Sequence, residues 1–197
     1  MIIAKKFLDL LSGILSHFGN AIPSNTYGTI LHGLSNIIGG KLKFRDIVLK
    51  HPCCLKCIEI YQAGKFSLEI DNSITWFCSN MCGGPPFPSF EEASALTSIC
   101  CQNLIKYEVG VHEDLELEAV WCISLYVESN DKKDLRIENM VTSNTVKRML
   151  QLTIRASHGA DYVLIKPLIR FFGNMFVGSN EIIESILNLE LVQVNDR

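Results

Sequence analysis

The chain has 197 residues, of which 48% are hydrophobic and 20% are charged, and its formal net charge is −3. This length and hydrophobic content predict a folded chain with a substantial core and exclude a largely disordered one. The Lys and Arg residues are dispersed and provide no electrostatic footprint for nucleic acid. Charged or polar residues interrupt every apolar run before the roughly 18–20 residues that a membrane span needs. We therefore expect neither nucleic acid nor a membrane as a direct partner.

The first segment, "MIIAKKFLDLLSGILSHFG", is only faintly similar to a secretory signal, because Asp9 interrupts its apolar part and no clear cleavage site follows. Apolar residues recur in it at intervals of three and four, which predicts an amphipathic helix. The expected apolar face comprises Phe7, Leu10, Leu11, Ile14, Leu15 and Phe18.

The rest of the chain consists of segments free of Gly and Pro, separated by short breaks. Long segments of this kind include 90–107, 112–129 and 142–157, and none shows the alternation of a strand. The breaks fall at 39–40, 83–88, 129–131, 158–161 and 177–180, where Gly, Pro, Ser, Asn and Asp gather. The sequence therefore predicts an all-α chain of short units.

Eight cysteines raise the question of a metal site. In "HPCCLKC", His51 and Cys53 to Cys57 contain a Cys-x-x-Cys spacing of the kind that can bind zinc, but a zinc site needs a second ligand pair. Neither Cys78 with Cys82 nor the adjacent pair at 100–101 has a suitable spacing. We predict instead buried, reduced and metal-free thiols at Cys53, Cys54, Cys57, Cys78 and Cys82.

The segment "ITWFCSNMCGG" at 74–84 places Trp76 and Asn80 four residues apart, which is one helical turn. An indole ring beside an amide that can both donate and accept suits an extended peptide. A buried tryptophan above an asparagine that caps the helix before the two glycines is the other interpretation. This segment alone leaves both open.

Similar segments occur at 29–40, 73–84, 118–129 and 167–178. Their key positions are His32, Trp76, Trp121 and Arg170, at intervals of 44 to 49 residues, in or just above the period of helical armadillo and HEAT arrays. We call the helices that carry these positions the ladder helices, because a repeated helix in a solenoid lines up its side chains along one surface. They are expected near 26–38, 67–82, 112–128 and 160–177 of a single domain that spans 1–197.

The segments that follow the first and third ladder helices are also alike. "KFRDIVLKHPCCLKCIEIY" and "DLRIENMVTSNTVKRMLQL" both predict a short helix, a break and a longer amphipathic helix. Three helices per unit indicate an armadillo-type, right-handed α-solenoid of about four repeats. Because no such unit closes its own core, each must stack on its neighbours.

The ladder segments resemble the armadillo domain of importin α, the family of adaptors that bind nuclear localisation signals. "SITWFCSN", "LEAVWCISLY" and "KPLIRFFGNMFVG" are similar to its AVWALSN, ACWALSYL and PALRAVGNIVTG helices. In the family the sixth repeat carries Arg at the ladder position, as Arg170 does, and a Pro-rich insertion follows the fourth, as "CGGPPFPSFEE" does here. The resemblance covers nearly the whole chain and corresponds to repeats three to six.

The resemblance implies a concave groove in which asparagine amides bind the backbone of a basic peptide and tryptophan rings pack on its lysine stems. It implies that Glu118 contacts a lysine ammonium group, whereas Arg170 favours carbonyl groups or acidic partners. The peptide-binding positions carried over are His32, Asn36, Trp76, Asn80, Glu118, Trp121, Arg170 and Asn174.

This sequence departs from the family at three of its expected positions. His32 replaces a tryptophan, Leu125 stands where the family has a tyrosine, and Gly40 replaces an acidic residue. The N-terminal Lys/Arg-rich segment by which the family recruits importin β is not found, and neither are the flanking repeats. The alternatives are therefore a generic armadillo interaction scaffold or a truncated importin α with impaired cargo binding.

The functional expectation is an adaptor-like protein for import into the nucleus, which binds nuclear localisation signal peptides of cargo and is located in cytoplasm and nucleus. No cofactor is expected. The histidines are scattered and no phosphate-binding loop or nucleophile elbow is present, so we do not expect an enzyme.

Overall fold

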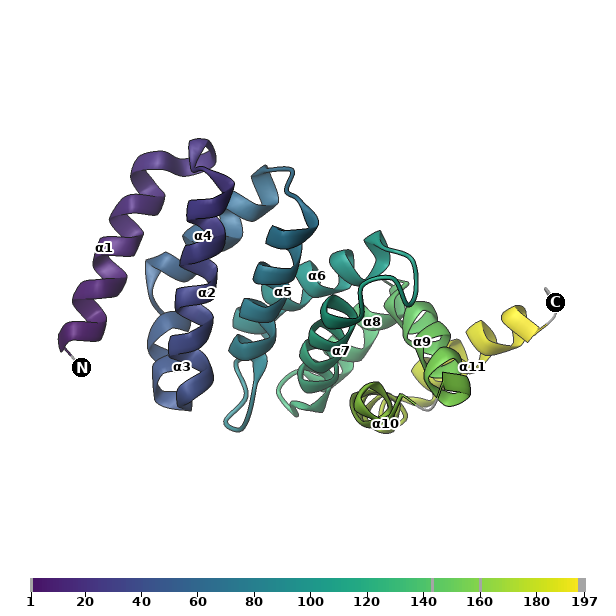
Figure 1. Ribbon diagram of the computed structural model, residues 1–197. Helices are drawn as coiled ribbons and strands as arrows, with labels where there is room; N and C mark the ends of the chain where they lie inside the picture. Colours follow the sequence, from purple (N-terminus) through teal and green to yellow (C-terminus); the bar gives the residue numbers. More distant parts are fainter. Residues whose placement is uncertain (1, 143, 160, 195–197) are drawn as a thin grey trace.

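The computed structural model describes residues 2–142, 144–159 and 161–194 and, within them, contains helices and no strand (Figure 1). None of the described helices is long and apolar enough to cross a membrane. The α-helices are α1 (Ile2–Phe18), α2 (Ser24–Gly40), α3 (Leu42–Leu49), α4 (Pro52–Ala63), α5 (Leu68–Cys82), α6 (Phe90–Lys106), α7 (Glu113–Glu128), α8 (Lys133–Thr142), α9 (Thr145–Gly159), α10 (Tyr162–Met175) and α11 (Asn180–Val194), and a short 3-10 helix (Gly19–Ala21) follows α1.

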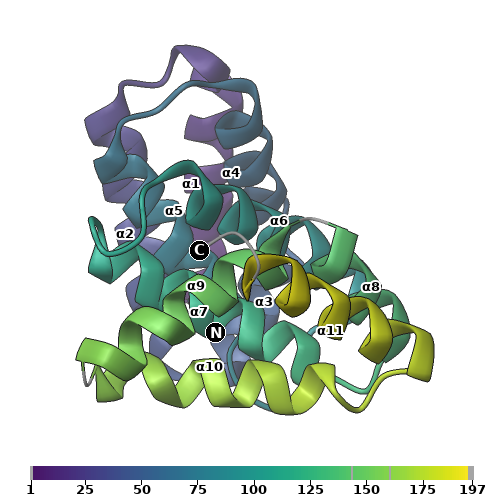
Figure 2. The ribbon, with the colours of Figure 1, turned by 90° about the vertical axis from the view of Figure 1, so that its right-hand side faces the viewer.

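The helices form an elongated stack with α1 and α11 at opposite ends (Figure 1), and in the view turned by 90° α10 runs lengthwise across the picture (Figure 2). The ladder helices are α2, α5, α7 and α10, and each packs against the next. The helices α1, α4, α6 and α9 form a second layer. In Figure 1, α2, α5 and α7 are seen from the side, whereas α10 is seen almost along its axis. The stack therefore turns sharply after α7. The predicted all-α, armadillo-type solenoid is confirmed.

One cluster of buried apolar side chains runs through the stack from α1 to α11. All eight cysteines are buried in it as free thiols, which confirms the predicted burial. Burial raises the pKa of Cys54 to about 12 and that of Cys78 to about 11, so these thiols stay neutral and unreactive near pH 7. His51 caps the start of α4, since its Nδ1 accepts from the backbone N–H of Cys53 at 3.2 Å.

The buried face of α1 differs from the predicted one. Leu11 and Leu15 are buried as expected, together with Leu8, which the prediction omitted. Phe7 and Leu10 remain exposed because α1 packs mainly on α4 and on the 3-10 turn, from one side. The apolar face of α1 is therefore wider than the surface that α1 buries against its neighbours.

The unit formed by α6 and α7 lacks the short first helix that a three-helix repeat predicts. The chain passes from α5 to α6 through the Pro-rich connection 83–89, in which Gly84 has a φ of +72°. Ser89 then starts α6 with a capping box, because its Oγ accepts from Glu92 N while the Glu92 carboxylate accepts from Ser89 N. Of the expected four three-helix repeats, two are complete, α3 to α5 and α8 to α10. Between them lies a unit of two helices, α6 and α7, in which the connection takes the place of the first helix.

Two buried arginines hold this connection from either side. Arg45 of α3 donates to the carbonyl groups of Gly83, Gly84 and Pro86, the last at 2.6 Å. Arg136 of α8 donates to Pro88 O at 3.0 Å, and also to the carbonyl groups of Tyr126 in α7 and of Asp131 after it. Neighbouring units therefore satisfy backbone groups that the missing helix leaves without partners.

Replacing the buried Arg45 with Ala is expected to lower the free energy of unfolding by about 3 kcal/mol, because three carbonyl groups of the connection lose a charged donor at once. Urea denaturation followed by circular dichroism measures this loss. Lys43→Ala, an exposed charge removal on the same helix, serves as the control. Equal stabilities of the two variants would contradict the bracing role of Arg45.

Candidate functional site

A pocket of about 370 Å³ opens between α5 and α7 beside Trp76. Trp76 is half-buried and forms part of its wall, so it is neither a core residue nor freely exposed. The pocket is lined by His32 from α2, by Glu69, Asn72, Ser73 and Trp76 from α5, and by Asp114, Leu115, Leu117 and Glu118 from α7. An aromatic ring with acidic and polar neighbours suits a cationic side chain with an aliphatic stem.

His32 takes part in this pocket, at the position where the resemblance leads us to expect a tryptophan. Its ring lies 5.4 Å from that of Trp76, centroid to centroid, at an angle of 52°. Its Nε2 lies 3.0 Å from the Ser73 hydroxyl on α5, a contact that orients the imidazole. Two ladder helices thus contribute adjacent rings to one wall.

Three carboxylates surround the pocket, and the sequence analysis singled out only Glu118. Glu69 and Asp114 were missed, although each stands seven residues, or two helical turns, before a ladder tryptophan and so lies on the same helical face. Glu118 of α7 lines the same pocket as Trp76 of α5. Burial raises the pKa of the Glu118 carboxyl, the nearby Asp114 adds to this, and a hydrogen bond from Ser79 opposes it.

Asn80 is half-buried one turn beyond Trp76 and does not line the pocket. Its Nδ2 is buried, and no described residue accepts a hydrogen bond from it. Its side chain faces Gly39 of α2, and the helix end is capped through its backbone O, which accepts from Gly83 N. The capping-asparagine interpretation is therefore wrong for the side chain. Asn36 is exposed on α2.

The surroundings of Trp121 differ from those of Trp76. Lys166 Nζ lies 5.7 Å and Arg170 Cζ 5.8 Å from the centroid of the Trp121 ring, and both residues belong to α10. Arg170 also pairs with Glu128 at 3.0 Å. Asn174 donates from Nδ2 to Arg170 O at 3.0 Å and so is engaged within its own helix.

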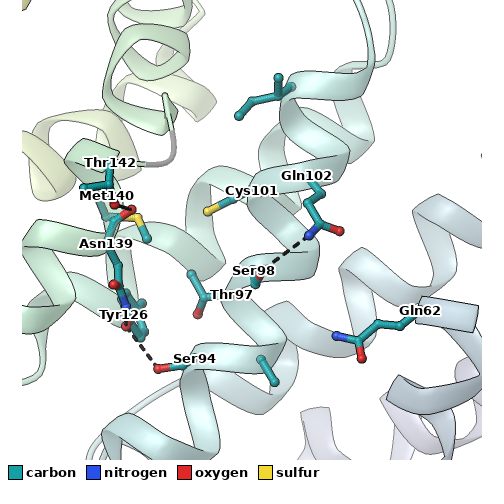
Figure 3. Close-up of a pocket in the computed structure, with 12 residues that line it drawn as sticks. Gln62, Ser94, Thr97, Ser98, Cys101, Gln102, Tyr126, Asn139, Met140 and Thr142 are labelled. Atoms are coloured by element: carbon teal, nitrogen blue, oxygen red, sulfur yellow. Dashed lines mark hydrogen bonds between the residues drawn. The ribbon is translucent and has the colours of Figure 1, made fainter.

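A larger pocket of about 530 Å³ lies on the outer side, between α6 and α8 (Figure 3). Figure 3 shows Thr97 and Cys101 of α6 on the side of Asn139 in α8, with Ser94 beside Tyr126. Its lining carries no charged side chain and no catalytic arrangement of groups. We assign it no function.

Solved structures similar to this one are armadillo-type proteins. A designed armadillo repeat protein in complex with the peptide (KR)4 superposes with a TM-score of 0.68 at 18% identity, covering 91% of this chain and 70% of that one. An engineered protein superposes with a TM-score of 0.66 at 16% identity, covering 91% of this chain and 68% of that one. The chain is an armadillo-type α-solenoid.

Among curated proteins the chain is similar to importin α subunits. It is 29% identical over 139 residues to importin subunit alpha-3 of Arabidopsis thaliana, which is 70% of this chain and 24% of that protein. It is 28% identical over 148 residues to importin subunit alpha-1b of Oryza sativa, which is 75% of this chain and 25% of that protein. The chain thus spans about a quarter of the length of these relatives, and no family model matches it.

Asn80→Ala is expected to change the free energy of unfolding by less than about 1 kcal/mol, because its buried Nδ2 makes no hydrogen bond that would be lost. Asn103→Ala is the matched control. Asn103 accepts from Tyr61 OH at 2.8 Å and donates to Thr75 Oγ1 at 3.0 Å, so its loss should destabilise the chain by roughly 2 kcal/mol. Thermal and urea unfolding compare the two. A large loss for Asn80→Ala would mean that this amide supports the fold.

Proposed function

We propose that the chain binds extended, lysine-rich peptides of the nuclear localisation signal type along its ladder helices. The observation that carries this proposal is the pocket at Trp76, where an indole ring is surrounded by Glu69, Asp114 and Glu118. A lysine stem packs on the ring while its ammonium group meets carboxylates, and this combination selects a long cation over a short or neutral side chain.

Two further points support the proposal. Asn80 offers a buried N–H donor without a partner among the described residues, next to the pocket, as a peptide carbonyl group requires. The similar designed armadillo protein was solved with a peptide of alternating lysine and arginine. By analogy with the importin α relatives, we propose an adaptor role in protein import into the nucleus, with the chain present in cytoplasm and nucleus.

The affinity should be modest. Peptide sites of this kind gain strength from several repeats in series, and this chain supplies one acidic aromatic pocket of the expected type among the described residues. Contacts with half-exposed carboxylates are also screened by salt, so binding should weaken as ionic strength rises.

Trp76→Ala should weaken binding of a lysine-rich peptide about tenfold, because the aromatic contact with the lysine stem is lost. Fluorescence anisotropy with a labelled peptide measures the dissociation constant, and the peptide with its lysines replaced by alanine should not bind. Phe18→Ala, an exposed aromatic residue on α1 outside the pocket, is the control and should bind as the parent does. If Trp76→Ala also keeps the parent affinity, the pocket does not bind the peptide.

Binding should also depend on pH through Glu118. Because burial raises the pKa of this carboxyl, it takes up a proton at a higher pH than an ordinary glutamate and then no longer attracts a lysine. Affinity is therefore expected to fall on acidification from neutral pH, beginning above the range in which the exposed carboxylates titrate. Glu118→Gln should bind more weakly at neutral pH and lose this early part of the pH dependence. If the affinity of Glu118→Gln still falls over the same pH range, a titrating group other than Glu118 causes the fall.

A further inference from the structure

Two cations of the chain itself occupy the face of Trp121. Lys166 and Arg170 stand four residues apart on α10, so both project toward α7 from the same side. Their charged ends lie within 6 Å of the ring centroid, the range in which a cation is attracted to an aromatic face. A lysine of a bound peptide would have to displace them to pack on Trp121.

The charges around this ring do not cancel. Glu128 neutralises Arg170 at 3.0 Å, but no carboxylate in the described part of the chain forms an ion pair with the exposed Lys166. Lys133 adds another positive charge nearby, with its Nζ 3.4 Å from Asn174 Oδ1. The immediate surroundings of the Trp121 ring therefore carry an excess positive charge, whereas the Trp76 pocket between α5 and α7 carries three carboxylates.

We infer that the Trp121 position binds a carboxylate side chain of the same peptide whose lysine enters the Trp76 pocket, so that the preferred ligand carries a lysine and an acidic residue in sequence. This inference rests on the proposed function. A carboxylate accepts hydrogen bonds from both the ammonium and the guanidinium group, whereas a lysine there meets like charge.

The ladder geometry sets the spacing of the two side chains. Neighbouring packed helices lie about 8–10 Å apart, and an extended chain advances about 3.3 Å per residue. The acidic residue should therefore stand about three residues from the lysine. The acidic residue can stand before or after the lysine in the sequence, because an extended peptide can lie along the ladder in two opposite directions.

The experiment compares three labelled peptides: a lysine block with Glu residues about three positions away, the same peptide with Gln in place of Glu, and an all-lysine peptide. Each of the mixed peptides is made in both orders and measured by anisotropy at fixed ionic strength. The parent chain should bind the Glu peptide in one order about fivefold more tightly than the Gln peptide.

Lys166→Glu should reverse this preference: the Glu peptide weakens to or below the Gln peptide, and the all-lysine peptide gains affinity. Lys147→Glu on α9 is the matched control, because it makes the same change of net charge at an exposed lysine outside this cluster. It should leave the order of preference unchanged. Circular dichroism checks that both variants fold.

The possible failures are distinguishable. If the lysine block binds and Trp76→Ala abolishes it, but Glu and Gln peptides bind equally, the inference falls and the proposed function stands. An equal shift in preference for Lys147→Glu and Lys166→Glu would assign the effect to net charge and also overturn the inference. If no lysine-containing peptide binds, the proposed function fails and the inference fails with it.

Discussion

The structure depends on the stacking of ladder helices that cannot bury their apolar faces alone. Each of the helices α2, α5, α7 and α10 packs against the next ladder helix in the stack. The cluster of buried apolar side chains runs through all four without a break. In such an array stability comes from the interfaces between units as much as from the units themselves. The same stacking places the side chains of successive helices next to one another on one surface.

Polar groups are buried where the stacking is irregular. Asp71 of α5 accepts hydrogen bonds from the hydroxyl groups of Tyr61 and Tyr107 and pairs with Lys106, which ties α5 to the helices on its outer side. Arg45 does the same for the Pro-rich connection after α5. These groups are stable inside because every charge has partners, and removing one partner would leave the others desolvated.

The surface formed by the ladder helices changes sign within one unit. The face around Trp76 carries carboxylates from α5 and α7, while the face around Trp121 carries cations from α10. Because α7 contributes to both faces, a peptide that followed the ladder would pass from the carboxylates at Trp76 to the cations at Trp121. We propose that such a surface distinguishes ligands by the order of their charges as well as by their lysine content.

The sequence by itself determined the helices, their repeat and their resemblance to importin α, because periodicity, breakers and the Trp76–Asn80 spacing are local properties of the chain. Only the tertiary structure decided that Glu118 of α7 lines a pocket with Trp76 of α5, and that Lys166 lies over Trp121. Those contacts join residues from different helices, so they follow from how neighbouring units rotate and pack. The Gly and Pro residues at 83–88 already predicted a break there, but only the tertiary structure showed that Arg45 and Arg136 from other units bind its carbonyl groups.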